Sequence, residues 1–121
     1  GSPFIATPEA RCSDDYRQAI VEGGAADIVN SALFTGIPGN YLRASIERSG
    51  LDPDTLHKLE SLPTEFGSEG SSRSKAWRDI WGSGQGIGAV SMVQPAADYV
   101  AQLDREYREA RERLCAISPR R

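Results

Sequence analysis

The residues best suited to contact a ligand lie in a glycine-rich stretch directly after a pair of tryptophans. Glycine stands at alternate positions from Gly82 to Gly88, and Trp77 and Trp81 precede this stretch at a spacing of four residues. A glycine loop lets a ligand approach the backbone without meeting a Cβ atom, and two residues four apart share one face of a helical turn. We therefore expect this stretch to form the main functional surface, suited to a flat and partly apolar ligand.

The spacing of these glycines differs from that of the common nucleotide-binding motifs. In the dinucleotide fingerprint the third glycine follows the second by three places, and the residue three places after Gly84 is Ile87. The stretch also follows a predicted helix instead of a strand, and the Gly-Lys-Ser or Gly-Lys-Thr sequence of a P-loop does not occur. Spacing alone leaves two interpretations open, a loop that contacts a ligand or a plain tight connection.

Few side chains of this chain could carry out acid-base or metal chemistry. His57 is the single histidine and lies in a polar segment, where a solvated helix residue is the usual interpretation. Cys12 and Cys115 lie near opposite ends without the spacing of a zinc or redox motif, so two free thiols are expected. No serine-histidine-aspartate arrangement or carboxylate pair stands out. We therefore assign no catalytic residue and no metal ligand here.

Composition and charge narrow the class of protein. The chain has 121 residues, a formal net charge of -3 and a hydrophobic fraction of 39%, with 12 glycines and 7 prolines. We expect one region with many irregular connecting segments. Its apolar content is low for an enzyme that folds and acts on its own. The acidic balance argues against a nucleic-acid partner. No apolar run approaches the ~18 residues that cross a bilayer and no signal-peptide pattern opens the chain, so we expect a cytoplasmic protein with no membrane partner.

The hydrophobic pattern predicts a mainly helical chain with one or two short β segments. Strand or extended structure is predicted at 4–7, within 26–34, and over the apolar run 87–93. The polar segment 61–74 predicts a mobile surface loop. Helices with a capping residue before them are predicted at 14–22 behind Ser13, 41–49 behind Asn40, 53–60 behind Asp52, and 75–81 behind Ser74.

The strongest periodicity predicts a long C-terminal helix within 95–117. Pro95 marks its start, and its apolar residues recur at steps of three and four on one face: Val100, Leu103, Tyr107, Ala110, Leu114 and Ile117. This repeat covers less than three heptads, which favours a structural stripe over a coiled-coil seam. The arginines of the segment alternate with acidic residues, as on a solvated helix face of mixed charge.

Four pieces of the sequence, taken in order, resemble the C-terminal third of the nitronate monooxygenases, also called 2-nitropropane dioxygenases. These pieces are 4–9, 13–20, 33–36 and 75–86. The resemblance implies an FMN enzyme on a (β/α)8 barrel, which oxidises alkyl nitronates with O2 to carbonyl compounds and nitrite. Such a barrel needs eight strands and ~250 residues. We therefore expect this chain to be a fragment that supplies only the last strand, at 4–7, and the helical subdomain after it.

The resemblance also implies which residues bind the cofactor. The family holds the flavin phosphate with a Gly-Thr-Arg-Phe sequence after its last strand, and the corresponding residues here are Gly1, Ser2, Pro3 and Phe4. Ser2 keeps a hydroxyl, whereas Pro3 replaces the arginine. A second family segment returns to the flavin side of the barrel, and its counterpart is Ser83, Gly84, Gln85 and Gly86, with Gln85 as the first polar group to test and Trp77 and Trp81 supporting the loop.

The family's catalytic histidine lies upstream of the matched region, and His57 lies in the variable polar part and does not replace it. The isolated chain is therefore expected to be inactive, with the barrel of the parent chain, a nitronate and O2 as its partners. Three alternatives stay open. One is a segment of a flavin-dependent enoyl reductase on the same fold. Another is a non-catalytic helical module that self-associates as a homo-oligomer, and the third is an interaction domain with no enzymatic ancestry.

Overall fold

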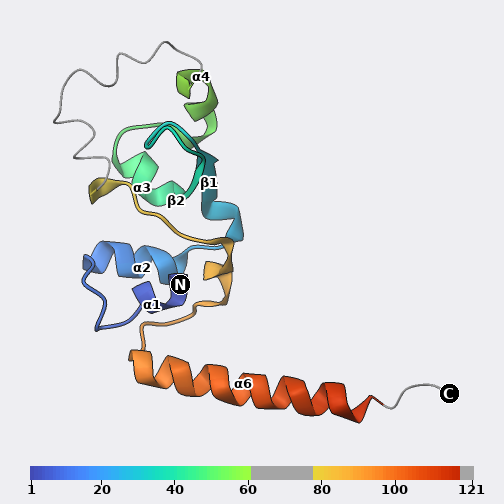
Figure 1. Cartoon of the computed structure of the whole chain (residues 1–121). Helices are drawn as coiled ribbons and strands as arrows, with labels where there is room; N and C mark the ends of the chain where they lie inside the picture. The colour runs from blue at the N-terminus through green and yellow to red at the C-terminus, as the bar shows by residue number, and fades with distance from the viewer. Residues whose placement is uncertain (61–77, 118–121) are drawn as a thin grey trace.

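The computed structural model describes residues 1–60 and 78–117, and this part of the chain is mainly helical with one two-stranded sheet, as the sequence predicted. Figure 1 shows the hairpin with α3 and α4 at one end of the molecule, α1 and α2 in the middle, and α6 at the other end. The elements in chain order, with η for a 3-10 helix, are α1 (Ser2–Ile5), α2 (Asp14–Glu22), η1 (Ala25–Asp27), β1 (Ile28–Ser31), β2 (Gly39–Leu42), α3 (Arg43–Arg48), η2 (Pro53–Thr55), α4 (Leu56–Glu60), η3 (Gln85–Ala89) and α6 (Ala96–Ala116).

The strand predicted at 4–7 is wrong, because this segment lies in α1 and the turn after it. Pro3 occupies the first turn of the helix, where its fixed φ fits and its missing N–H costs nothing. The backbone groups are bonded locally: the Ala6 N–H donates to the Pro3 carbonyl at 3.1 Å, and the Thr7 hydroxyl donates to the Phe4 carbonyl at 2.8 Å. A strand needs a neighbour, and within residues 1–60 and 78–117 the only paired strands are β1 and β2.

The helix predicted at 14–22 is confirmed as α2, with the same bounds. The Ser13 hydroxyl accepts a hydrogen bond from the Tyr16 backbone N–H at 3.2 Å, and Asp14 and Asp15 lie in the first turn. Both features stabilise the N-terminus of the helix, because a hydroxyl accepts from a free backbone N–H and carboxylates lie at the positive end of the helix dipole. The local sequence therefore specifies where this helix begins.

The hairpin contains one predicted strand and one that the sequence did not indicate. β1 lies within the extended segment predicted at 26–34, and it pairs antiparallel with β2, with Ile28 opposite Leu42. β2 replaces the first turn of the helix predicted at 41–49. Asn40 does not cap that helix, because its side-chain carbonyl accepts a hydrogen bond from the Asn30 amide across the hairpin at 2.9 Å. The helix begins at Arg43 instead, as α3.

α3 ends before a glycine, and the start of α4 follows the predicted cap at Asp52. Gly50 has a φ of 81° just after α3, a left-handed conformation that favours glycine at the end of a helix. The Asp52 carboxylate accepts a hydrogen bond from the Asp54 N–H at 3.0 Å before the 3-10 turn η2 and the short helix α4. The predicted loop 61–74, Ser74 and Trp77 lie outside the described residues.

Two small clusters of buried apolar side chains form the core. The first cluster, which we call the lower core, joins Ala6, Ile20, Leu42 and Ile87. The second, which we call the upper core, joins Ile46, Leu56 and Ile80. Leu42 and Ile46 lie at the two sides of the junction between β2 and α3, so this junction connects the clusters.

The apolar run predicted as extended at 87–93 instead begins within the 3-10 helix η3. Ile87 is fully buried in the lower core, whereas Met92 and Val93 are exposed. The run therefore contributes one fully buried residue to the lower core, and its later residues are exposed to solvent. Of the helix predicted at 75–81, residues 78 and 79 are helical, and Trp81 lies beyond them.

The long C-terminal helix is confirmed as α6, and it begins after Pro95. Its first turn is attached to the body. The Glu9 carboxylate accepts from the Ala96 N–H at 3.1 Å, and the Phe4 and Tyr99 rings meet edge to face at 5.1 Å. The C-terminal part of α6 extends away from the body (Figure 1). Among the described helices, none combines the length and apolarity that would let it cross a membrane.

Candidate functional site

The glycine-rich stretch is fixed along the free edge of the hairpin. The Leu42 N–H donates to the Trp81 carbonyl at 2.8 Å, and the Ser83 N–H donates to the Asn40 carbonyl at 3.1 Å. Gly82 lies opposite Tyr41 in an isolated antiparallel bridge. The loop therefore leaves the sheet with a defined direction and carries the residues after Ser83 toward α1.

The structure brings together the two groups of residues that the sequence analysis assigned to the cofactor. The Gly84 N–H donates a hydrogen bond of 2.9 Å to the Ser2 hydroxyl oxygen, although 82 positions separate them. A Cβ added at Gly84 would lie 3.4 Å from this oxygen, in ordinary van der Waals contact. Of the residues next to this contact in the sequence, Gly1, Gln85 and Gly86 are exposed and Ser83 is buried.

An aromatic stack supports the entry to the loop. The rings of Tyr16 and Trp81 stack at 5.1 Å with an angle of 12° between their planes, and the Arg48 guanidinium lies 5.4 Å from the Trp81 ring. The Tyr16 hydroxyl donates to the Gly82 carbonyl. Burial raises the pKa of Tyr16 above its ordinary value, with a smaller contribution from Cys12. The stack agrees with the supporting position predicted for Trp81, and its partner Tyr16 was not among the residues predicted for the site.

A hollow of about 310 Å³ lies beside α1, between the segment after η3 and the start of α6. Three long polar side chains reach it: Gln94, Gln102 and Arg105. Pro3 forms part of the same lining, so the hollow borders the segment that contains Ser2. No sequence signal identified these residues, because Gln102 and Arg105 read as ordinary members of a charged helix face. The remaining lining residues are Ala89, Val90, Ser91, Met92 and Tyr99.

The loop, the aromatic stack and the hollow offer groups that can bind a ligand, but no pair of side chains placed for acid-base or nucleophilic catalysis among the described residues. His57 is exposed in α4, away from Ser2 and Gly84, and both cysteines are free. Residues 1–60 and 78–117 contain no group of three or more His, Cys, Asp or Glu side chains that could hold a metal ion. The arrangement can orient a polar or anionic ligand through hydroxyl, amide and guanidinium groups.

The Ser2 hydroxyl can donate one hydrogen bond to a phosphate group, which is one part of the fit that an FMN cofactor would require. The Ser2 oxygen accepts from Gly84, so the hydrogen of its hydroxyl stays available to a ligand. The loop is open at Gly86, where an added Cβ would meet no atom within 4 Å. Pro3 provides no cation, and Arg105 is the one guanidinium in the lining of the adjacent hollow.

The fold matches that of solved structures. A point mutant of FabK from Thermotoga maritima superposes with a TM-score of 0.68 at 19% identity, over 98% of this chain and 36% of FabK. FabK itself gives 0.66 at 20% identity, over 98% of this chain and 39% of FabK. The region shared is the C-terminal part of the FabK barrel. The chain thus spans less than two-fifths of these structures. Neither a protein-family model nor a curated protein sequence matches it.

Proposed function

We propose that this chain is the C-terminal part of an FMN-dependent oxidoreductase on a (β/α)8 barrel. The observation that carries the proposal is the fold likeness to FabK over 98% of the chain. FabK is a flavin-dependent enoyl reductase of the 2-nitropropane dioxygenase-like barrel proteins, which is the group that the sequence pieces resemble. The sequence resemblance and the fold likeness both support a flavin enzyme.

In this proposal the contact between Ser2 and Gly84 forms one edge of the flavin phosphate site. The Ser2 hydroxyl donates to a phosphate oxygen, while Gly84 holds that hydroxyl in place. Gly1, Gly86 and Ser83 shape the backbone around the phosphate, and Gln85 is exposed at the side where the flavin ring or the substrate would lie. Arg105 reaches the adjacent hollow and compensates for the proline at position 3.

The first candidate reaction is oxidation of alkyl nitronates by O2, as the sequence resemblance implies. FMN, when bound, supplies the electron transfer to O2. The residues described here bind and orient and do not move protons, so the base is a residue of another part of the protein. The barrel, the nitronate and O2 are accordingly the proposed partners, and the isolated chain is inactive.

The second candidate reaction is reduction of an enoyl substrate, which the fold likeness to FabK favours. The two candidates differ in their electron donor and product. A protein that carries the complete barrel would release nitrite from a nitronate in the first case. It would oxidise NADH or NADPH when given an enoyl thioester in the second.

The test uses the protein in the length that its gene encodes. We expect it to purify with flavin absorbance and to show one of the two activities. The variant Ser2→Ala is expected to weaken FMN binding about tenfold, the cost of one hydrogen bond to a charged group. Ser2→Thr keeps the hydroxyl and is the matched control. A colourless protein that neither binds added FMN nor shows either activity would refute the proposal.

A further inference from the structure

The apolar stripe of α6 faces solvent, with Ala110 alone partly buried. No residue of this helix is buried, and Val100, Leu103, Tyr107 and Leu114 are between 40% and 70% exposed. The repeat predicted a stripe packed in a globular unit, and within the described part of the chain no element covers it. Large apolar side chains lined up on one solvent-facing helix are unusual for a soluble domain, so this face is an interaction surface.

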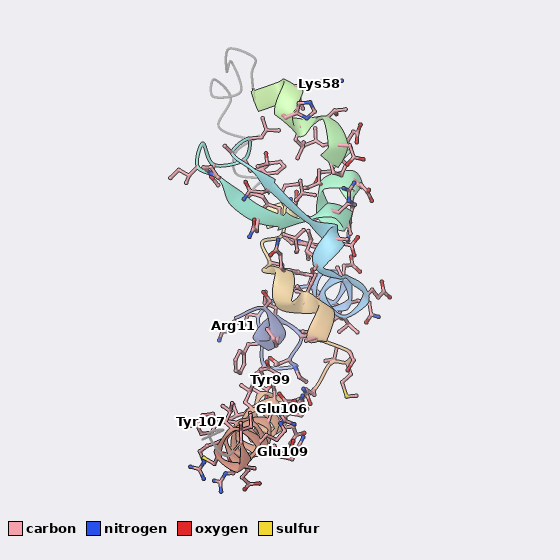
Figure 2. All side chains as sticks on the ribbon, turned by 90° about the vertical axis from the view of Figure 1, so that its right-hand side faces the viewer. Arg11, Lys58, Tyr99, Glu106, Tyr107 and Glu109 are labelled. Atoms are coloured by element: carbon pink, nitrogen blue, oxygen red, sulfur yellow. The ribbon has the colours of Figure 1, made fainter. Side chains whose placement is uncertain are left out.

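The body of the molecule contacts a different face of α6. Tyr99 meets Phe4, and the Gln102 side chain accepts a hydrogen bond from Gln94 at 3.2 Å. Figure 2 views α6 nearly along its axis, with Tyr99 on the side toward α1 and Tyr107 on another side. The body therefore leaves the stripe accessible.

The six apolar residues of the stripe occupy three successive pairs of a and d positions of a heptad repeat. Counting Val100 as position a places residues 100, 107 and 114 at a, and residues 103, 110 and 117 at d. Residues 104 and 111 then flank the stripe at e, and residues 106 and 113 at g. The flanking charges are segregated along the helix, with Asp104 and Glu106 in the first half and Arg111 and Arg113 in the second.

We propose that the occupant of this face is the α6 helix of a second copy of this chain, packed antiparallel. In this register Leu103 lies against Leu114 of the second copy and the large Tyr107 against the small Ala110. Val100 lies against Ile117, the residue that directly follows α6. The flanking positions pair Asp104 with Arg111 and Glu106 with Arg113, and each pair occurs twice by symmetry. Every layer is apolar and complementary in size, and every flanking pair has opposite charges.

The parallel arrangement fits less well. It would place Tyr107 against Tyr107 and Ala110 against Ala110, so that one layer is crowded and the next is empty. It would also bring both bodies to the same end, since the body is attached at the first turn of α6. The antiparallel arrangement places the bodies at opposite ends. The ion pair between Arg108 and Asp104 is exposed, so its rearrangement on pairing costs little.

The test measures association of the 121-residue chain by sedimentation over a range of concentrations. We expect a reversible monomer-dimer equilibrium. An acidic variant, Arg111→Glu with Arg113→Glu, and a basic variant, Asp104→Arg with Glu106→Arg, should each raise the dimer Kd by at least about tenfold, because attractive pairs become repulsive. An equal mixture of the two variants should dimerise again, because all flanking pairs are then opposite in charge.

The matched control is Glu109→Arg with Glu112→Arg, which changes the net charge as much as the basic variant does. These residues are at positions c and f, away from the stripe, so the control should keep the wild-type Kd. Circular dichroism verifies that each variant keeps its helix. The proposal is overturned if the wild-type chain stays monomeric. That result would favour another part of a longer polypeptide as the occupant of the stripe. It is equally overturned if the charge variants associate like the wild type, as in unspecific apolar association.

The orientation has its own readout. Cys115 is exposed and accepts a spin label in a Cys12→Ser background. In the antiparallel register Cys115 lies opposite Gln102 of the second copy, so the two labels are separated along the axis by roughly 20 Å at 1.5 Å per residue. Labels that lie side by side would mean parallel helices and would contradict the proposal. This inference does not depend on flavin binding, so a colourless protein would leave it intact.

Discussion

The buried hydroxyl of Ser45 connects α3 to the backbone of Trp81. Its oxygen accepts a hydrogen bond from the Trp81 N–H at 3.0 Å, and its hydrogen is donated to the Leu42 carbonyl at 2.8 Å. Ser45 is 0% exposed, so water cannot replace either bond. This one side chain holds the entry of the glycine loop against the helix that follows the hairpin.

Replacing Ser45 by alanine should leave the Trp81 N–H without a partner in the interior. We expect Ser45→Ala to lower the free energy of unfolding by about 1–3 kcal/mol, the usual cost of an unsatisfied buried group. Denaturant unfolding monitored by tryptophan fluorescence measures this change. Ser91→Ala removes an exposed hydroxyl and is the control. Equal stability of the two variants would contradict the structural role of Ser45.

Gly23 lies where α2 meets the lower core, and it has no room for a side chain. An added Cβ would approach the Ala19 carbonyl oxygen to 2.8 Å and the Ile87 side chain to 3.0 Å. Since the first contact is with backbone, Gly23→Ala should destabilise the fold by about 1–3 kcal/mol. Gly88→Ala is the matched variant, because its nearest contact is an ordinary 3.8 Å. Thermal unfolding compares the two, and a Gly23→Ala protein as stable as Gly88→Ala would show that the end of α2 can shift freely.

Ile87 interrupts the glycine stretch with a fully buried side chain. We expect Ile87→Ala to cost about 2–5 kcal/mol, since it removes methyl groups from the lower core and leaves a cavity. Ile37 is 72% exposed on the hairpin loop, so Ile37→Ala should change stability by less than about 0.5 kcal/mol. Chemical unfolding of both proteins gives the comparison. A small effect at Ile87 would mean that this residue faces a ligand instead of the core.

Tyr16 makes stability depend on alkaline pH. Burial raises the pKa of its hydroxyl above the ordinary value of 10.0, so the folded state holds the proton more tightly than the unfolded state. The stability that Tyr16 contributes is fully present below pH 10.0 and is lost as the pH rises through the pKa of Tyr16 in the folded state. The wild type should therefore lose more stability than Tyr16→Phe between about pH 9 and 11. Melting temperatures across this range measure the difference.

Tyr107 provides the control for this pH dependence. Its side chain is 66% exposed on the unpaired α6, so the comparison is made below the Kd of the proposed dimer, where Tyr107→Phe should keep the alkaline loss of stability of the wild type. If Tyr16→Phe and Tyr107→Phe lose stability in parallel with the wild type, the alkaline transition belongs to other groups.

Sequence reasoning succeeded where local signals decide the structure. α2 follows from the Ser13 cap and the acidic first turn, and α6 follows from Pro95 and the apolar period. It was wrong at 4–7, because a short apolar run fits a helix or a strand equally well. At Asn40 the signal for a helix cap competed with a cross-strand amide pair, and the pair prevailed once the hairpin formed.

The candidate site depended on contacts that no local pattern contains. Ser2 and Gly84 were assigned to one cofactor by family resemblance, and the structure brings them within hydrogen-bond distance. Whether they bind that cofactor stays a prediction. Gln94, Gln102 and Arg105 have no distinguishing spacing, and only the packing of α6 beside α1 reveals their common hollow.

The division of the core affects how the chain folds during synthesis. The lower core needs Ile87 and the upper core needs Ile80, although their other members all lie within the first 56 residues. While only those earlier residues have been synthesised, each cluster lacks one of its buried side chains, and its apolar residues stay partly exposed to water. We therefore expect stable tertiary structure in this part of the chain only after the glycine stretch has left the exit tunnel.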